Sequence, residues 1–162
     1  MGYKVLISYS TKGGNTEKLA KAIAEGVNSV DGFKAILKRA KETTPQDLVE
    51  ADGIILGSPV YFGTMSAEMK DLIDRSVVVR RKLKDKVGAV FTTSGHITGG
   101  KETTMFSMIY AMLIHEMIVV GDPIDAGGHY GVACTGEPKE NDLENGRKLG
   151  IRVCNVIKKL RS

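Results

Sequence analysis

Three short segments of the chain combine glycines with hydroxyl side chains in a way that suits ligand binding. They are residues 10–16 (STKGGNT), 58–65 (SPVYFGTM) and 93–100 (TSGHITGG). Each follows directly on an apolar run that is typical of a buried strand. Ligands of open α/β sheets bind just beyond the carboxyl ends of the strands, so the three segments predict a single site.

The first segment has the composition of a phosphate-binding loop. N–H groups at the start of a helix lack intrahelical acceptors and carry partial positive charge, so they attract anions. Ser10, Thr11 and Thr16 add hydroxyl groups and Asn15 adds an amide. The alternative is an ordinary helix start with Asn15 or Thr16 as the N-cap. The two interpretations are compatible, because an N-cap and an anion use the same donors.

The second and third segments suit a flat aromatic ring. In the second, Tyr61 and Phe62 offer apolar surface, Pro59 stiffens the turn, and Gly63 permits close approach of the backbone. The alternative is that both aromatic residues belong to the core. In the third, glycines leave the backbone bare for the polar edge of the ring, and His96 is either a site residue or a solvated loop residue.

Competing phosphate motifs are excluded. The chain has no GxGxxG, the usual dinucleotide fingerprint. Residues 95–101 match GxxxxGK, but Glu102 follows where a nucleoside-triphosphate loop needs Ser or Thr to hold magnesium. Residues 57–59 (GSP) lack the phosphate-accepting aspartate of a receiver domain.

Strand and helix patterns alternate along the whole chain. Continuous apolar runs predict strands at residues 5–7, 33–37, 53–57, 87–92 and 117–120, and an additional strand is expected at 131–134 within the long connection 122–141. Helices are predicted after the Asn-Thr-Glu at 15–17, over 44–51, over a segment carrying Met65, Met69, Leu72 and Ile73, over 101–116, and at the end with Leu149, Val153, Val156 and Leu160 inward. Continuous apolar strands imply burial on both faces, which predicts a parallel α/β sheet between two helical layers.

Bulk properties favour a single domain over residues 1–162. The chain is 42% hydrophobic, which is enough for a core between two helical layers. Cys134 and Cys154 form no CxxC pattern, so we expect neither a metal site nor a disulfide framework, and a reducing, cytoplasmic compartment. No apolar run approaches the ~18 residues of a membrane span. The net charge of +4 is spread over helix faces, so nucleic-acid binding is not expected.

The segments resemble the FMN loops of flavodoxin-fold proteins, most closely NAD(P)H:quinone oxidoreductases of the Trp-repressor-binding-protein type and NADPH-dependent FMN reductases. The matching stretches are residues 5–23, 57–75 and 90–104, and the resemblance covers nearly the whole chain. It implies a flavodoxin-like three-layer sandwich with a five-stranded parallel sheet in the order 2-1-3-4-5.

The resemblance also implies which residues contact FMN. Phosphate contacts fall on Ser10, Thr11, Gly13, Asn15 and Thr16, ring contacts fall on Val60, Tyr61, Phe62, Gly63, Thr93, Ser94, Gly95 and Gly100, and His115 reaches the flavin site. Their neighbours Lys12, Gly14, Pro59, His96 and Gly99 complete the predicted cofactor-binding set. The chain departs from the family at residues 60–64, where VYFGT replaces the common TRFGN, and in a first loop one residue longer than that of usual flavodoxins.

Two functions of different class fit these features. The first is an enzyme in which NAD(P)H reduces bound FMN and a quinone or similar small molecule takes two electrons, with Tyr61, His96 and His115 as candidate helpers. The second is a flavodoxin-type carrier that passes single electrons between proteins. Such carriers are generally acidic, whereas this chain has a pI near 9.0. That charge favours the enzyme and suits anionic NADPH, for which Lys12, Arg80, Arg81 and Lys101 are candidate contacts.

The helix predicted over 101–116 is apolar nearly all round, which suggests one face for the sheet and another for a partner subunit. We therefore expect a homo-oligomer, a dimer or a tetramer. In the family, the neighbourhood of His115 lies near a subunit contact. The alternative role for His115 is that of a cation favoured by the helix dipole.

Overall fold

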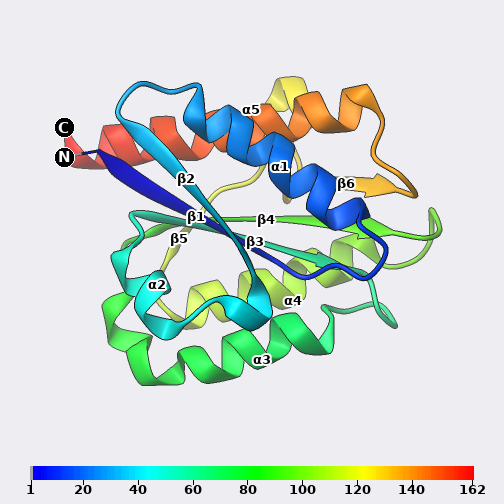
Figure 1. Cartoon of the computed structure of the whole chain (residues 1–162), viewed down its shortest axis with the longest axis horizontal. Helices are drawn as coiled ribbons and strands as arrows, with labels where there is room; N and C mark the ends of the chain where they lie inside the picture. Colours follow the sequence, from blue (N-terminus) through cyan, green and yellow to red (C-terminus); the bar gives the residue numbers. More distant parts are fainter. Residues whose placement is uncertain (1) are drawn as a thin grey trace.

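A parallel sheet lies between two layers of helices in the computed structural model, which describes residues 2–162 (Figure 1). Its strands are β1 (Tyr3–Tyr9), β2 (Phe33–Arg39), β3 (Gly53–Pro59), β4 (Val87–Ser94), β5 (Ile118–Val119) and β6 (Val132–Thr135). The order is β2-β1-β3-β4-β5, and every pairing is parallel. The predicted order 2-1-3-4-5 is therefore confirmed.

The outer position beside β4 is shared by two short strands. β5 pairs with Val87 and Gly88 at the start of β4, and β6 pairs with residues 91–94 at its end. The additional strand expected at 131–134 is thus confirmed, and it continues the line of β5. The connection between β5 and β6 contains the 3₁₀ helix η3 (Ile124–Ala126).

Helices cover both faces of the sheet. α1 (Asn15–Asn28) and α5 (Glu140–Arg161) lie on one face, and α2 (Pro45–Glu50), α3 (Ala67–Arg75) and α4 (Lys101–Ile114) lie on the other (Figure 1). The 3₁₀ helices η1 (Ala40–Glu42) and η2 (Ser76–Lys82) extend the second layer. No helix among residues 2–162 is both long and apolar enough to cross a membrane.

Alternate residues of the strands build two cores. In β1, Val5 and Ile7 pack with α1 and α5, while Leu6 packs with α3 and α4 on the opposite face. All three are essentially inaccessible to solvent. The prediction that continuous apolar strands are buried on both faces is confirmed.

Two details of the predicted helices are wrong. Met65 precedes α3, because Ser66 is the N-cap and its hydroxyl accepts from the N–H of Met69. Met65 still packs in the same core as Met69 and Leu72. Leu160 is 51% exposed, and Ile157 takes the inward position near the end of α5.

Candidate functional site

The three predicted loops meet at the carboxyl edge of the sheet, on the right of Figure 1. The N–H of Val60 donates to the carbonyl oxygen of Thr93 over 2.8 Å, which joins the second loop to the third. The hydroxyl oxygens of Thr16 and Thr93 lie 2.8 Å apart and join the first loop to the third. The structure thus brings together the three loops that the sequence placed in one site.

The first loop presents unpaired backbone donors at the start of α1. Gly14, with φ of +93°, occupies the N-cap position and no side chain caps the helix, so the expectation of Asn15 or Thr16 as N-cap is wrong. The first helical hydrogen bond runs from Lys18 N–H to Gly14 O over 3.0 Å. The N–H groups before it have no intrahelical acceptor. A Cβ atom built on Gly13 or Gly14 would have no other atom within 4 Å. Uncapped donors facing open space fit a phosphate group.

Two of the predicted phosphate-binding hydroxyls are used inside the protein. Ser10 and Thr16 are 2% and 1% exposed. The Ser10 hydroxyl lies 2.6 Å from that of Ser66, and the Thr16 hydroxyl bonds Thr93. These buried bonds brace the loops against one another, and phosphate contact by either hydroxyl stays a prediction. Thr11 is only partly buried and accepts from the N–H of Gly14 over 3.0 Å.

The second loop ends in a tight turn with an exposed aromatic tip. Tyr61 and Thr64 exchange backbone hydrogen bonds of 2.9 and 3.0 Å, which leaves Phe62 and Gly63 at the corner with φ of +50° and +76°. Positive φ at both central residues is the type I′ pattern. Phe62 is fully exposed and Tyr61 is 39% exposed, so the alternative that both belong to the core is wrong. A bulky residue at positive φ is uncommon and occurs in turns or under strain.

The third loop lies directly against the second. A Cβ atom on Gly100 would fall 2.8 Å from the Cα atom of Gly63, so the two backbones touch only because Gly100 lacks a side chain. The hydroxyl of Thr103 donates to the carbonyl of Gly63 across the same contact. His96 is exposed and its Nδ1 lies 2.9 Å from the Thr98 hydroxyl, so it stands at the rim of the site.

A pocket of 330 Å³ opens beside the first and second loops. Its lining residues are Ser10, Thr11, Lys12, Pro59, Tyr61, Ser66, Ala67 and Glu68. The volume is within the range of small-molecule sites. The mixture of hydroxyl, charged and apolar groups suits a ligand with a phosphorylated polar chain and a flat ring.

His115 is not brought to the three loops within one chain. It is the C-cap of α4, with Nε2 2.8 Å from the hydroxyl of Ser76. Gly100 of the third loop precedes the same 14-residue helix. At 1.5 Å per residue the helix separates the two by about 20 Å. Arg80, a predicted NADPH contact, lies at this far end as well, with Nε 3.4 Å from the carbonyl oxygen of Ile114.

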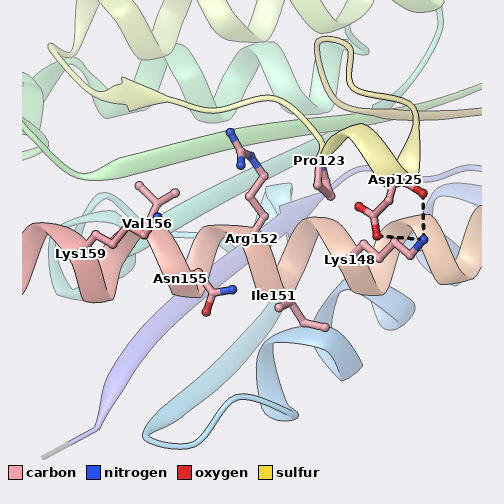
Figure 2. Close-up of a pocket in the computed structure, with 8 residues that line it drawn as sticks. All are labelled: Pro123, Asp125, Lys148, Ile151, Arg152, Asn155, Val156 and Lys159. Atoms are coloured by element: carbon pink, nitrogen blue, oxygen red, sulfur yellow. Dashed lines mark hydrogen bonds and ion pairs between the residues drawn. The ribbon is translucent and has the colours of Figure 1, made fainter.

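A second pocket, of 390 Å³, lies along α5 and receives no residue from the three loops (Figure 2). Three of its four charged side chains, those of Asp125, Lys148 and Arg152, are engaged within the protein. Lys148 pairs with Asp125 at 3.3 Å, and Arg152 Nε donates to the carbonyl of Gly121 over 2.9 Å. We therefore place the candidate site at the loops.

The site has no cysteine nucleophile. Burial raises the pKa of both Cys134 and Cys154 to about 12, so the thiols stay protonated, as the interpretation of them as small packed side chains requires. Among residues 2–162 no cluster of His, Cys, Asp and Glu has the arrangement of a metal site.

Sequence analysis missed two serines beneath the loops, Ser58 and Ser66. The hydroxyl of Ser58 accepts from the N–H of Ser66 over 2.8 Å, and Ser10 donates to Ser58 over 3.4 Å. Ser10 and Ser58 are 48 positions apart, so no local pattern pairs them, and only Ser66 had a local signal, its position as a helix N-cap before residues 67–69.

The chain is similar to known proteins in sequence and in fold. Residues 38–130 match the family model described as NADPH-dependent FMN reductase. The chain is 39% identical to an NAD(P)H dehydrogenase (quinone) of Archaeoglobus fulgidus, over 97% of this chain and 98% of the relative. It is 35% identical to a flavodoxin of Aquifex aeolicus, over 95% and 86%. A similar solved structure is that of a protein from Agrobacterium tumefaciens described as a WrbA-like flavodoxin. Its TM-score is 0.82 and its sequence identity is 26%, over 98% of this chain and 99% of that protein.

Proposed function

This chain belongs to the NADPH-dependent FMN reductase family, and on that premise we propose that it is an FMN-dependent oxidoreductase that moves two electrons from NAD(P)H to a quinone or similar acceptor. The observation that carries the proposal is the uncapped start of α1, which lies beside two loops joined by backbone contact. An anion and a flat ring, held by adjacent loops, are the two halves of FMN.

The residues present fit FMN. The N–H groups of Gly13 and Asn15, which have no acceptor among residues 2–162, would hold the phosphate, and the second and third loops would hold the ring. When bound, FMN would supply the redox chemistry, the two-electron exchange between NAD(P)H and the acceptor. The protein supplies position. Tyr61 and His96, at the rim, donate hydrogen bonds to the acceptor, and Lys12 in the pocket attracts the anionic nucleotide.

A homo-oligomer is part of the proposal. Tyr110, Leu113 and Ile114 of α4 and Val77 and Val78 of η2 are each more than half exposed. They form a patch, here the α4–η2 patch, because η2 contacts the end of α4 through Ser76 and His115. Exposed apolar patches mark interaction sites. His115 then reaches a flavin site only from a neighbouring copy of the chain. Light scattering at micromolar concentration tests this, since a monomeric mass refutes it.

We also infer a cytoplasmic location. Both cysteines are free and buried, and unpaired thiols are typical of a reducing compartment. A disulfide-linked species in protein isolated from cells, seen on non-reducing gels, would contradict the inference.

The second candidate function is a flavodoxin-type electron carrier, favoured by relatives that carry the name flavodoxin. The net charge of +4 opposes it, because carriers of that type generally meet basic partners through acidic surfaces. We therefore rank it second.

An anaerobic visible spectrum of the FMN-loaded protein separates the two functions. We expect NADPH or NADH to bleach the bound-flavin band, and a quinone to restore it. If neither nucleotide reduces the bound flavin, but the flavin exchanges electrons with a redox protein, the protein would be an electron carrier and not an enzyme. Protein that binds no FMN would overturn both.

A further inference from the structure

Arg39, the last residue of β2, links the first loop to the start of α3. Its Nη2 donates to the carbonyl oxygen of Thr11 over 3.1 Å. The same guanidinium grips both carboxylate oxygens of Glu68, with Nε 3.2 Å from Oε1 and Nη2 2.8 Å from Oε2. Glu68 lines the pocket beside the first loop. Arg39 is therefore a clamp on the backbone of the loop that meets the phosphate.

The clamp fixes a peptide group. All described peptide bonds are trans, so the Thr11 carbonyl and the Lys12 N–H point in opposite directions. Because Arg39 holds the carbonyl, the direction of the N–H is fixed as well. Within residues 2–162, the Lys12 N–H has no acceptor. A fixed and unpaired N–H in an anion-binding loop is ready to donate to a ligand oxygen.

We propose that Arg39 is a positioning residue for the flavin phosphate, which orients the Thr11–Lys12 peptide so that the Lys12 N–H donates to a phosphate oxygen. The role rests on the proposed FMN-dependent function. It is distinct from charge attraction, because Glu68 offsets the positive charge at hydrogen-bond distance. The fork shape of the guanidinium is essential, since it holds the carboxylate and the carbonyl at the same time.

The ring of Tyr9 also restricts the orientation of the Arg39 guanidinium. The Arg39 carbon Cζ lies 5.9 Å above the centre of the Tyr9 ring. The side chains of Arg39 and Glu68 are 26% and 25% exposed, so solvent competes little for their bonds. Three contacts in different directions leave the guanidinium one orientation.

Comparing FMN with riboflavin isolates the proposed role. The two flavins share a ring and differ by the phosphate, so a positioning residue for the phosphate affects only FMN. In Arg39→Met we expect the affinity for FMN to fall about ten-fold, the size of one lost hydrogen bond to a charged group, and the affinity for riboflavin to change by less than about two-fold. Fluorescence titration of the full chain with each flavin measures both dissociation constants.

Arg39→Lys distinguishes position from charge. Lysine keeps the charge but lacks the fork, so we expect it to lose most of the same FMN affinity. Arg147→Lys is the matched control, because Arg147 is also ion-paired, with Glu25, Glu140 and Glu144, but touches no loop of the site. It should bind both flavins like the wild type. Urea unfolding of each flavin-free variant confirms that it is folded.

Each outcome has one meaning. If Arg39→Lys binds FMN like the wild type while Arg39→Met loses affinity, Arg39 would act by charge attraction and not by positioning. Equal losses for FMN and riboflavin, or no loss in either variant, would overturn the role of Arg39 while leaving the proposed function intact. Failure of the wild type to bind FMN would instead overturn the proposed function.

Discussion

Replacing Gly100 by alanine tests the contact between the second and third loops. Gly100 has a φ of +101°, and its added Cβ would lie 2.8 Å from the Cα atom of Gly63 and 3.0 Å from the Thr103 hydroxyl. The left-handed conformation alone costs an alanine about 1–2 kcal/mol. Forcing two backbones apart adds about 1–3 kcal/mol. We therefore expect Gly100→Ala to lower the free energy of unfolding by about 2–5 kcal/mol in total.

Gly32→Ala is the matched control. Gly32 has a similar φ of +82°, lies in the turn before β2, and has open space where the Cβ would stand. It should therefore lose only the conformational part, about 1–2 kcal/mol. Urea unfolding of the flavin-free proteins measures both values. The FMN dissociation constant should rise about ten-fold in Gly100→Ala, because the preorganised gap between the loops is lost, and should not change in Gly32→Ala. Equal stability losses in the two variants, with FMN affinity unchanged in both, would refute the close-contact explanation.

Three further predictions concern the same loops and the buried thiols. Asn15→Asp combined with Thr16→Val should weaken FMN binding strongly while the chain stays folded. Unchanged FMN affinity in a titration would show that the first loop does not bind the phosphate. Thr16→Val and Thr93→Val should show a coupling free energy of about 1 kcal/mol in a double-mutant cycle of urea unfolding, and additive losses would mean that their 2.8 Å bond does not brace the loops. Cys134 and Cys154 have pKa values raised by burial from 9.0 to about 12. The unfolded chain therefore loses these protons first, and their contribution to stability, complete below pH 9.0, should fall as the pH rises toward 12. Both thiols should resist iodoacetamide at pH 8 in the native protein and react in urea, whereas rapid native alkylation would contradict their burial.

The sheet was predictable because its signal is local. Val5, Leu6 and Ile7 form a continuous apolar run, which is typical of a strand buried on both faces, and the structure places them in two opposite cores. The three loops were predictable for a similar reason, since each directly follows such a run. Whether they meet depends on the parallel order of the strands, which the family resemblance supplied.

The features that could not be predicted depend on contacts between distant residues. Arg39 and Glu68 are separated by 29 positions, and no spacing rule pairs the end of a strand with the start of a later helix. The N-cap of α1 was predicted wrongly for another reason. A capping side chain would occupy the donors that an anion needs, and here Gly14 leaves them free. The rule for ordinary helix starts fails where the helix start is itself a binding site.

The site has two parts with different roles, a buried base beneath the loops and the exposed tips of the loops. Beneath the loops, Ser10, Thr16 and Thr93 are buried, with Ser10 hydrogen-bonded to Ser66 and Thr16 to Thr93. The loops are therefore positioned before any ligand arrives, and less ordering entropy opposes binding. At the tips, Phe62 and Ile97 are at least 70% exposed and contribute little to the core. Substitution of the base should therefore change the affinity for FMN, and substitution of the tips should change which electron acceptor reaches it. A tip variant such as Ile97→Ser that alters the KM for a quinone and leaves the FMN dissociation constant unchanged would support the division, whereas loss of FMN from that variant would contradict it.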